Sequence, residues 1–177
     1  MKPKVFIASI IYLCFAVFTL SAATASAATL TAGQGEAAPG AKDIVIPVTL
    51  SSEKGEDVSS LNLDLDFDSA KFSFKQIAIG QAALSAGKDI SLSTLAAGKL
   101  RMVITALNKN VIADGVVANI SFDIAKEAVS GDSVLTISKA IAADKDARKV
   151  GLATSDGKIT ISAGKLKGPR RQRYFRN

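Results

Sequence analysis

The chain has 177 residues, of which 22 are basic and 16 acidic, and it contains one cysteine, no tryptophan and no histidine. The missing histidine excludes Ser-His-Asp and Cys-His catalytic constellations and removes the commonest general base and transition-metal ligand. A chain of this length is typical of one domain with peripheral segments.

Residues 1–27 have the pattern of a secretory signal peptide. Two lysines precede an apolar run over residues 5–20, and Ala25-Ser26-Ala27 matches an A-x-A cleavage site. The alternative is a retained membrane anchor, but the run is shorter than the roughly 20 residues that a spanning helix requires. Cys14 lies inside this segment and follows Leu13, where a lipoprotein signal has a small residue. We therefore expect an exported protein, in the extracellular space, on the cell surface or in the periplasm, with no membrane span in its mature form and no disulfide.

From residue 44 onward, apolar residues recur with the period of two that indicates β-strands. The clearest run has Leu61, Leu63, Leu65 and Phe67 alternating with polar residues. In chain order, the expected strands cover residues 44–50, 61–67, 72–79, 90–95, 100–107, 116–124, 134–141 and 158–162. Turn-forming pairs such as Pro39-Gly40 and Asp114-Gly115 separate the runs, and the alanine-rich residues 81–87 fit a short helix or a loop. The pattern predicts an all-β sandwich or barrel over residues 28–163.

The positive net charge belongs to the C-terminal tail, residues 164–177. Residues 28–164 hold 14 basic and 16 acidic side chains, a balance of −2. The tail has no acidic residue and no periodicity, so we expect it to be disordered. Because the body carries no basic patch, no nucleic-acid partner is expected. The tail's basic residues are Lys165, Lys167, Arg170, Arg171, Arg173 and Arg176.

The acidic row Asp64, Asp66 and Asp68 raises the question of a calcium site. An EF-hand loop starting at Asp64 requires glycine and glutamate where Ser69 and Lys75 stand. Alternate residues of a strand are also about 6.6 Å apart, whereas two ligands of one calcium are at most about 4.8 Å apart. We interpret the row as a solvated polar face or a partner-facing surface. The acidic loop at residues 144–148 lacks the same EF-hand positions and is expected to be a surface loop. The chain is therefore expected to hold no metal or cofactor.

Several segments, in this order and spacing, resemble a cohesin domain over residues 29–162. They are residues 44–50, 61–68, 98–110, 114–122 and 155–161. The resemblance implies a nine-stranded jelly-roll β-sandwich that binds a dockerin, a small helical module of another exported protein. It also implies that the calcium is on the dockerin and that the complex can serve polysaccharide breakdown. In cellulosomal cohesins the third strand carries an asparagine and an aspartate two residues apart, where Ser60 and Asn62 stand here. We therefore do not expect the ordinary cellulosomal dockerin specificity.

The resemblance also implies that the dockerin binds one sheet face, which includes the third, fifth, sixth and eighth strands. Alternation assigns its residues, because apolar side chains that face the core leave their neighbours pointing outward. With Met102, Ile104 and Ala106 inward, the other side chains of that strand face outward. The candidate partner-binding residues are Ser60, Asn62, Asp64, Asp66, Arg101, Val103, Thr105 and Leu107.

Two further non-catalytic functions and one catalytic function stay open at this stage. A carbohydrate-binding module of related fold would bind polysaccharide, usually on exposed aromatic rings, but the body offers only phenylalanines, which we expect in the core. A structural subunit of a surface assembly would pair through its edge strands. Two carboxylates could hydrolyse a glycoside. The absent histidines and aromatic platforms favour a protein that is not an enzyme.

Overall fold

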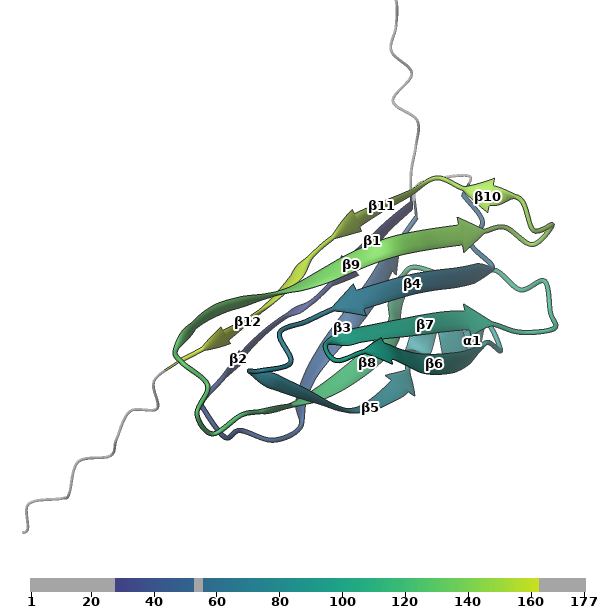
Figure 1. Cartoon of the computed structure of the whole chain (residues 1–177). Coiled ribbons are helices and arrows are strands. Elements are labelled where there is room, and N and C mark those ends of the chain that lie inside the picture. Colours follow the sequence, from purple (N-terminus) through teal and green to yellow (C-terminus); the bar gives the residue numbers. More distant parts are fainter. Residues whose placement is uncertain (1–27, 53–55, 163–177) are drawn as a thin grey trace, which may run out of the picture.

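A computed structural model describes residues 28–52 and 56–162 of the chain, which form strands and one short helix (Figure 1). The expected signal peptide and basic tail lie outside these residues. The elements are β1 (Ala28–Ala32), β2 (Gln34–Ala37), β3 (Ile44–Ser51), β4 (Ser60–Asp66), β5 (Phe72–Ile79), α1 (Gln81–Ser85), β6 (Asp89–Ala96), β7 (Lys99–Thr105), β8 (Gly115–Ile124), β9 (Gly131–Ala143), β10 (Lys149–Val150), β11 (Leu152–Ser155) and β12 (Gly157–Ile161).

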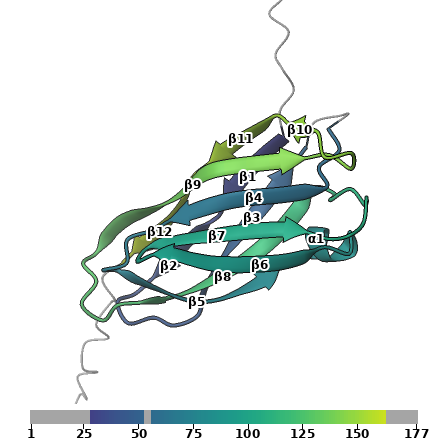
Figure 2. The same cartoon turned by 45° about the vertical axis from the view of Figure 1, so that its right-hand side comes forward.

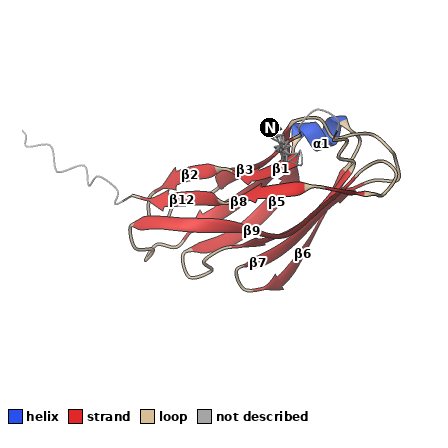
Figure 3. Cartoon of the chain, turned by 90° about the horizontal axis from the view of Figure 1, so that it is seen from above, coloured by secondary structure: helices blue, strands red, loops and turns tan. Residues whose placement is uncertain are grey.

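The strands form two sheets that pack face to face, so the predicted all-β sandwich is confirmed (Figures 1 and 2). One sheet, called here the β8 sheet, has the order β11-β1-β3-β8-β5. The other, called the β4 sheet, has the order β2-β12-β9-β4-β7-β6, with β10 added beside β9. Seen from above, the two layers are separate, and α1 lies near one end of the sandwich (Figure 3).

Both ends of the domain pass from one sheet to the other. The N-terminal run enters the β8 sheet as β1 and continues in the β4 sheet as β2, while the C-terminal run does the same as β11 and β12. The two runs are parallel partners in both sheets. They meet at glycines, because a Cβ on Gly157 would lie 2.5 Å from the carbonyl oxygen of Gly33. Counting each switching run once, with β10 joined to the last, the segments form nine strands, as the cohesin resemblance implied.

The core lies between the sheets and is built by strict alternation. In β4, Leu61, Leu63 and Leu65 are buried, and in β7 the buried side chains are Leu100, Met102 and Ile104. Each of these three β7 residues is paired with one of the three leucines. The two rows point inward together because opposite residues of an antiparallel pair share a face. The predicted inward assignment is confirmed for Met102 and Ile104, whereas Ala106 is only half-buried.

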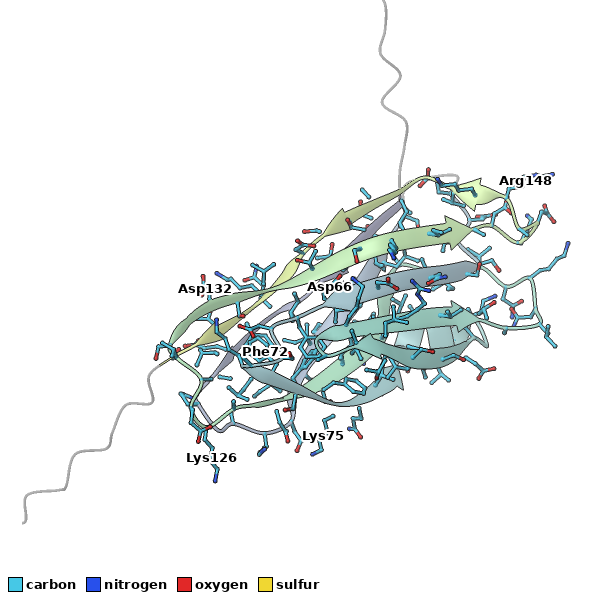
Figure 4. All side chains as sticks on the ribbon, in the orientation of Figure 1. Asp66, Phe72, Lys75, Lys126, Asp132 and Arg148 are labelled. Carbon is cyan, nitrogen blue, oxygen red and sulfur yellow. The ribbon has the colours of Figure 1, made fainter. Side chains whose placement is uncertain are left out.

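An aromatic cluster fills one part of the core. The ring of Phe122 is fully buried and contacts three others edge to face, with centroid distances of 5.1 Å to Phe67, 6.2 Å to Phe72 and 6.5 Å to Phe74. Phe72 is also buried, and the side chains in Figure 4 place it at one end of the sandwich. The phenylalanines of the described strands therefore serve mainly packing, as predicted.

Two details differ from the sequence-based expectation, and one open alternative is settled. The strand predicted over residues 100–107 ends at Thr105, so Leu107 lies in a loop. Residues 81–87, left open between helix and loop, begin with the one-turn helix α1. Strands β1, β2, β10 and β11 were not predicted. Within residues 28–52 and 56–162, no helix is long and apolar enough to cross a membrane.

Candidate binding face

The outward face of β9, β4, β7 and β6 brings most of the predicted residues together, and we call it the candidate face. Asn62 lies opposite Val103 on one side and opposite Ile141 on the other. In the next row, Asp64 lies between Arg101 and Ser138. Ser60 and Thr105 lie at the end of the same two strands, β4 and β7. Seven of the eight predicted residues are thus on the strands of this face, and Leu107 follows it in a loop.

The centre of the candidate face is an ion pair. Arg101 donates two hydrogen bonds to Asp64, from Nε to Oδ1 at 2.6 Å and from Nη2 to Oδ2 at 2.9 Å. The Asp64 side chain has no exposed surface, although it points away from the core, whereas Arg101 is 37% exposed. The Nζ of Lys139 lies 3.9 Å from the same carboxylate. Asp64 is therefore covered by its neighbours, and Arg101 is the member of the pair that a partner can touch.

The ion pair has an electrostatic consequence for both groups. The Arg101 guanidinium, by its hydrogen bonds, holds the pKa of the Asp64 carboxyl below its usual value against the opposing effect of burial. The same bonds raise the pKa of Arg101. Both groups are thus charged at neutral pH, and the pair is a fixed feature of the face.

A second pair continues the charged row toward the end of β4. Lys99 Nζ donates to Asp66 Oδ1 at 2.5 Å, and Ser138 Oγ donates to Oδ2 of the same carboxylate at 2.7 Å. The hydrogen bond from Lys99 and, to a smaller extent, the bond from Ser138 lower the pKa of the Asp66 carboxyl. Figure 4 shows Asp66 at the end of β4. Within residues 28–52 and 56–162 no group of three or more acidic side chains is arranged to hold a metal ion. Asp64 and Asp66 bind cationic side chains instead.

Exposed aliphatic side chains flank the charged row, and two of them were not among the predicted residues. Ile141 is 51% and Val134 54% exposed on β9. Between them the strand has a β-bulge where the register with β4 shifts, and Lys139 there has a φ of 49°. The extra residue resets the alternation, so that Ser138 and Ile141 both face outward. No signal in the sequence marks this bulge.

The loop after β7 holds Leu107 at the rim of the candidate face. Its neighbour Asn108 donates from Nδ2 to the Gly87 carbonyl at 2.8 Å and accepts from Lys88 Nζ at 2.7 Å. Lys88 is buried, which lowers its pKa, and it also donates to Ser59 Oγ at 3.0 Å. The Ser59 hydroxyl in turn donates to the Asn110 carbonyl. This network fixes the loop beside the start of β4, while the Leu107 side chain is fully exposed.

Replacing Arg101 with methionine is expected to destabilise the fold by about 2 kcal/mol. Methionine would still shield the carboxylate of Asp64 from water, but it cannot donate the two hydrogen bonds that the guanidinium supplies. Alanine at the same position should cost less, although it removes more atoms, because water can then reach the carboxylate. Stabilisation by a carboxyl with a lowered pKa is present above the unfolded value of about 3.9 and is lost as pH falls through the folded value. The difference in the free energy of unfolding between the wild type and the methionine variant should therefore shrink below about pH 4.

Urea titrations at several pH values measure this difference. If methionine and alanine lower the free energy of unfolding equally, the interpretation of Asp64 as a carboxylate shielded from water is wrong.

The fold has counterparts among known proteins. The model of the cohesin domain family matches residues 28–161. The cohesin CaCohA2 of Clostridium acetobutylicum is 27% identical, with a TM-score of 0.66 over 77% of this chain and 92% of that chain. CaCohA2 has also been solved in complex with CaDoc0917. Comparison with the curated proteins finds no match.

Two more distant solved structures share the fold. The sixth cohesin of scaffoldin B from Acetivibrio cellulolyticus, in complex with the Cel5 dockerin, is 21% identical with a TM-score of 0.70, over 77% of this chain and 100% of that chain. A non-cellulosomal cohesin of the archaeon Archaeoglobus fulgidus is 21% identical with a TM-score of 0.67, over 79% of this chain and 94% of that chain.

Proposed function

Because the chain belongs to the cohesin domain family, we propose that it binds a dockerin module of a partner protein and catalyses no reaction itself. The observation that carries the proposal is the family match over residues 28–161, which includes every strand of the sandwich. The Acetivibrio cellulolyticus cohesin of the same fold was solved with a dockerin bound. We assign the binding to the candidate face, and we infer that the complex serves polysaccharide breakdown.

The chemistry of the candidate face suits a protein partner. Its centre carries charges already paired within the chain, and exposed aliphatic side chains stand beside them at Ile141, Val134 and Leu107. An apolar surface mixed with fixed polar groups is typical of protein interfaces. Ser60 and Asn62 are both half-buried there, and both side chains are uncharged. A dockerin that recognises this chain therefore has to complement an uncharged end of β4.

The direct experiment is calorimetric titration of the chain with each dockerin module encoded by the same organism. We expect binding to at least one of them, in the presence of calcium. Removing calcium with a chelator should abolish binding, because the metal is expected on the dockerin, and should leave the melting temperature of this chain unchanged. Binding of cellulose or another glycan, with no dockerin bound, would instead support the carbohydrate-binding alternative.

Export is part of the same proposal, and residues 1–27 are its basis. The fold begins immediately afterwards, since Ala28 is fully buried and its backbone N–H donates to the Gly151 carbonyl at 3.0 Å. We expect cleavage after Ala27 and a mature chain that starts at about Ala28. Mass spectrometry of the protein recovered outside the cytoplasm measures this, and a mature chain that retains residues 1–20 would refute it.

A further inference from the structure

The sandwich has an edge strand without the usual protection against pairing. The edge strands of the two sheets are β11, β5, β2 and β6, together with the two-residue β10, which pairs only with β9. Strands β11 and β2 have four residues each, and β2 contains Glu36. Strand β5 carries Lys75, which forms an ion pair with Asp43 at the margin of the sandwich, and has a bulge beside it (Figure 4). Short length, lysine and bulges are the devices that keep edge strands from pairing.

Strand β6 has these devices only at its ends. It is eight residues long, and Asp89 at its start is its only charged residue. One side pairs with β7, and among the described residues no hydrogen bond reaches its other side. A bulge occurs only between Thr94 and Ala96. Residues 90–94 thus form a regular, uncharged segment with an open row of backbone donors and acceptors.

The side chains of this segment suit pairing with a copy of itself. Ile90, Leu92 and Thr94 lie opposite buried residues of β7 on the inner side of the strand, where Ile90 and Leu92 are half-buried and Thr94 is exposed at the margin. Ser91 and Ser93 are exposed on the outer face. Thr94 also lines an apolar pocket at the open side of the sandwich, together with Phe67, Phe72 and Phe74. A symmetric pair of β5 strands would bring two copies of Lys75 close together, so that like charges repel. A symmetric pair of β6 strands avoids this repulsion, because residues 90–94 carry no charge.

We propose that β6 pairs antiparallel with β6 of a second copy of this chain, across a two-fold axis perpendicular to the sheet. Directly opposite residues must share a face, so inward residues meet inward ones. The middle of the regular segment is Leu92, and the register that uses the whole segment sets Leu92 against Leu92 of the second copy. Ile90 then meets Thr94 of the second copy and covers its apolar pocket, and Ser91 meets Ser93. Such an interface is isologous and closes as a dimer.

The dimer would form one continuous sheet with both candidate faces on the same side. It could then hold two dockerin modules next to each other, a consequence that depends on the proposed function. The pairing itself does not, and its test uses no dockerin.

The first test is register-specific crosslinking in the full chain carrying Cys14→Ser, which has no other cysteine. Ser91→Cys mixed with Ser93→Cys should form disulfide-linked dimers, because these positions are directly opposite. Either variant alone should form far fewer, because its two copies are diagonal, at about 7–8 Å, beyond disulfide reach. Crosslinking of Ser93→Cys alone would overturn the register, and the absence of crosslinks in every sample would overturn the pairing.

The second test is the mass in solution, measured by light scattering during gel filtration. We expect twice the mass of one chain for the wild type and the mass of one chain for Ser91→Lys/Ser93→Lys. The matched control is Ser73→Lys/Gln76→Lys, which adds the same charge to exposed positions on β5, an edge strand of the opposite sheet, and should stay dimeric. Circular dichroism confirms that each variant is folded. A monomeric wild type, or a dimer that the β6 lysines leave intact, would overturn the proposal.

Discussion

Replacing Phe122 with alanine is expected to lower the free energy of unfolding by about 4 kcal/mol. The ring has no exposed surface and sits in β8, between β3 and β5 in the β8 sheet. Its loss would leave a cavity against three other rings, and edge-to-face pairs add about 0.5–1.5 kcal/mol each beyond burial. Neither strand next to β8 has another ring that could fill the space without displacing its own contacts.

The measurement is urea unfolding followed by far-ultraviolet circular dichroism, since the chain has no tryptophan. Phe74→Ala is the matched control, because Phe74 is a phenylalanine of the same cluster that lies on edge strand β5 and is only partly buried. It should cost clearly less than Phe122→Ala. Equal costs would mean that Phe122 is not the centre of the aromatic cluster.

Most central strands could be predicted because their alternation is strong. In β4 and β7 every second residue is a large aliphatic side chain, so the period of two marks both the strand and its inward face. Strands β1 and β2 lack that signal. Ala28 and Ala32 are buried there as fully as Leu30, but alanine and glycine are ambiguous in a sequence. Their partners are β3 and β11 for β1 and β12 for β2, and both β11 and β12 lie more than a hundred residues later in the chain.

The candidate face could be predicted in outline, and its details depend on tertiary contacts. Alternation correctly set Asp64 on the outward side of β4, but it could not show that Arg101 and Lys139 would cover its carboxylate. Ile141 was missed because the bulge at Lys139 shifts the alternation by one residue. Leu107 was assigned to a strand, and the structure places it in a loop held by side-chain amides. Each of these facts depends on residues distant in the sequence.

Asn62→Ala combined with Leu107→Ala is expected to weaken binding of a confirmed dockerin partner strongly. Each truncation costs about 1–2 kcal/mol when the partner covers the side chain, which we expect for Asn62 on β4 and for the fully exposed Leu107 beside it. The pair would then raise Kd by roughly 30- to 700-fold. Stability should barely change, because Leu107 is fully exposed and Asn62 is half-buried on the outer face of β4. Calorimetric titration measures the binding, and thermal unfolding measures the fold.

The matched control lies on the outer face of the opposite sheet. Asn119 of β8 is half-buried and Val45 of β3 is 52% exposed, so Asn119→Ala with Val45→Ala removes the same kinds of group from the β8 sheet. This control should bind the dockerin as the wild type does. If it weakens binding and the first pair does not, the partner uses the β8 sheet and the assignment to the candidate face is wrong. If the first pair unfolds the protein, the outward position of Asn62 is wrong. Full binding by both variants would place the interface at neither face, and the edge strands or loops would then be the surfaces to test.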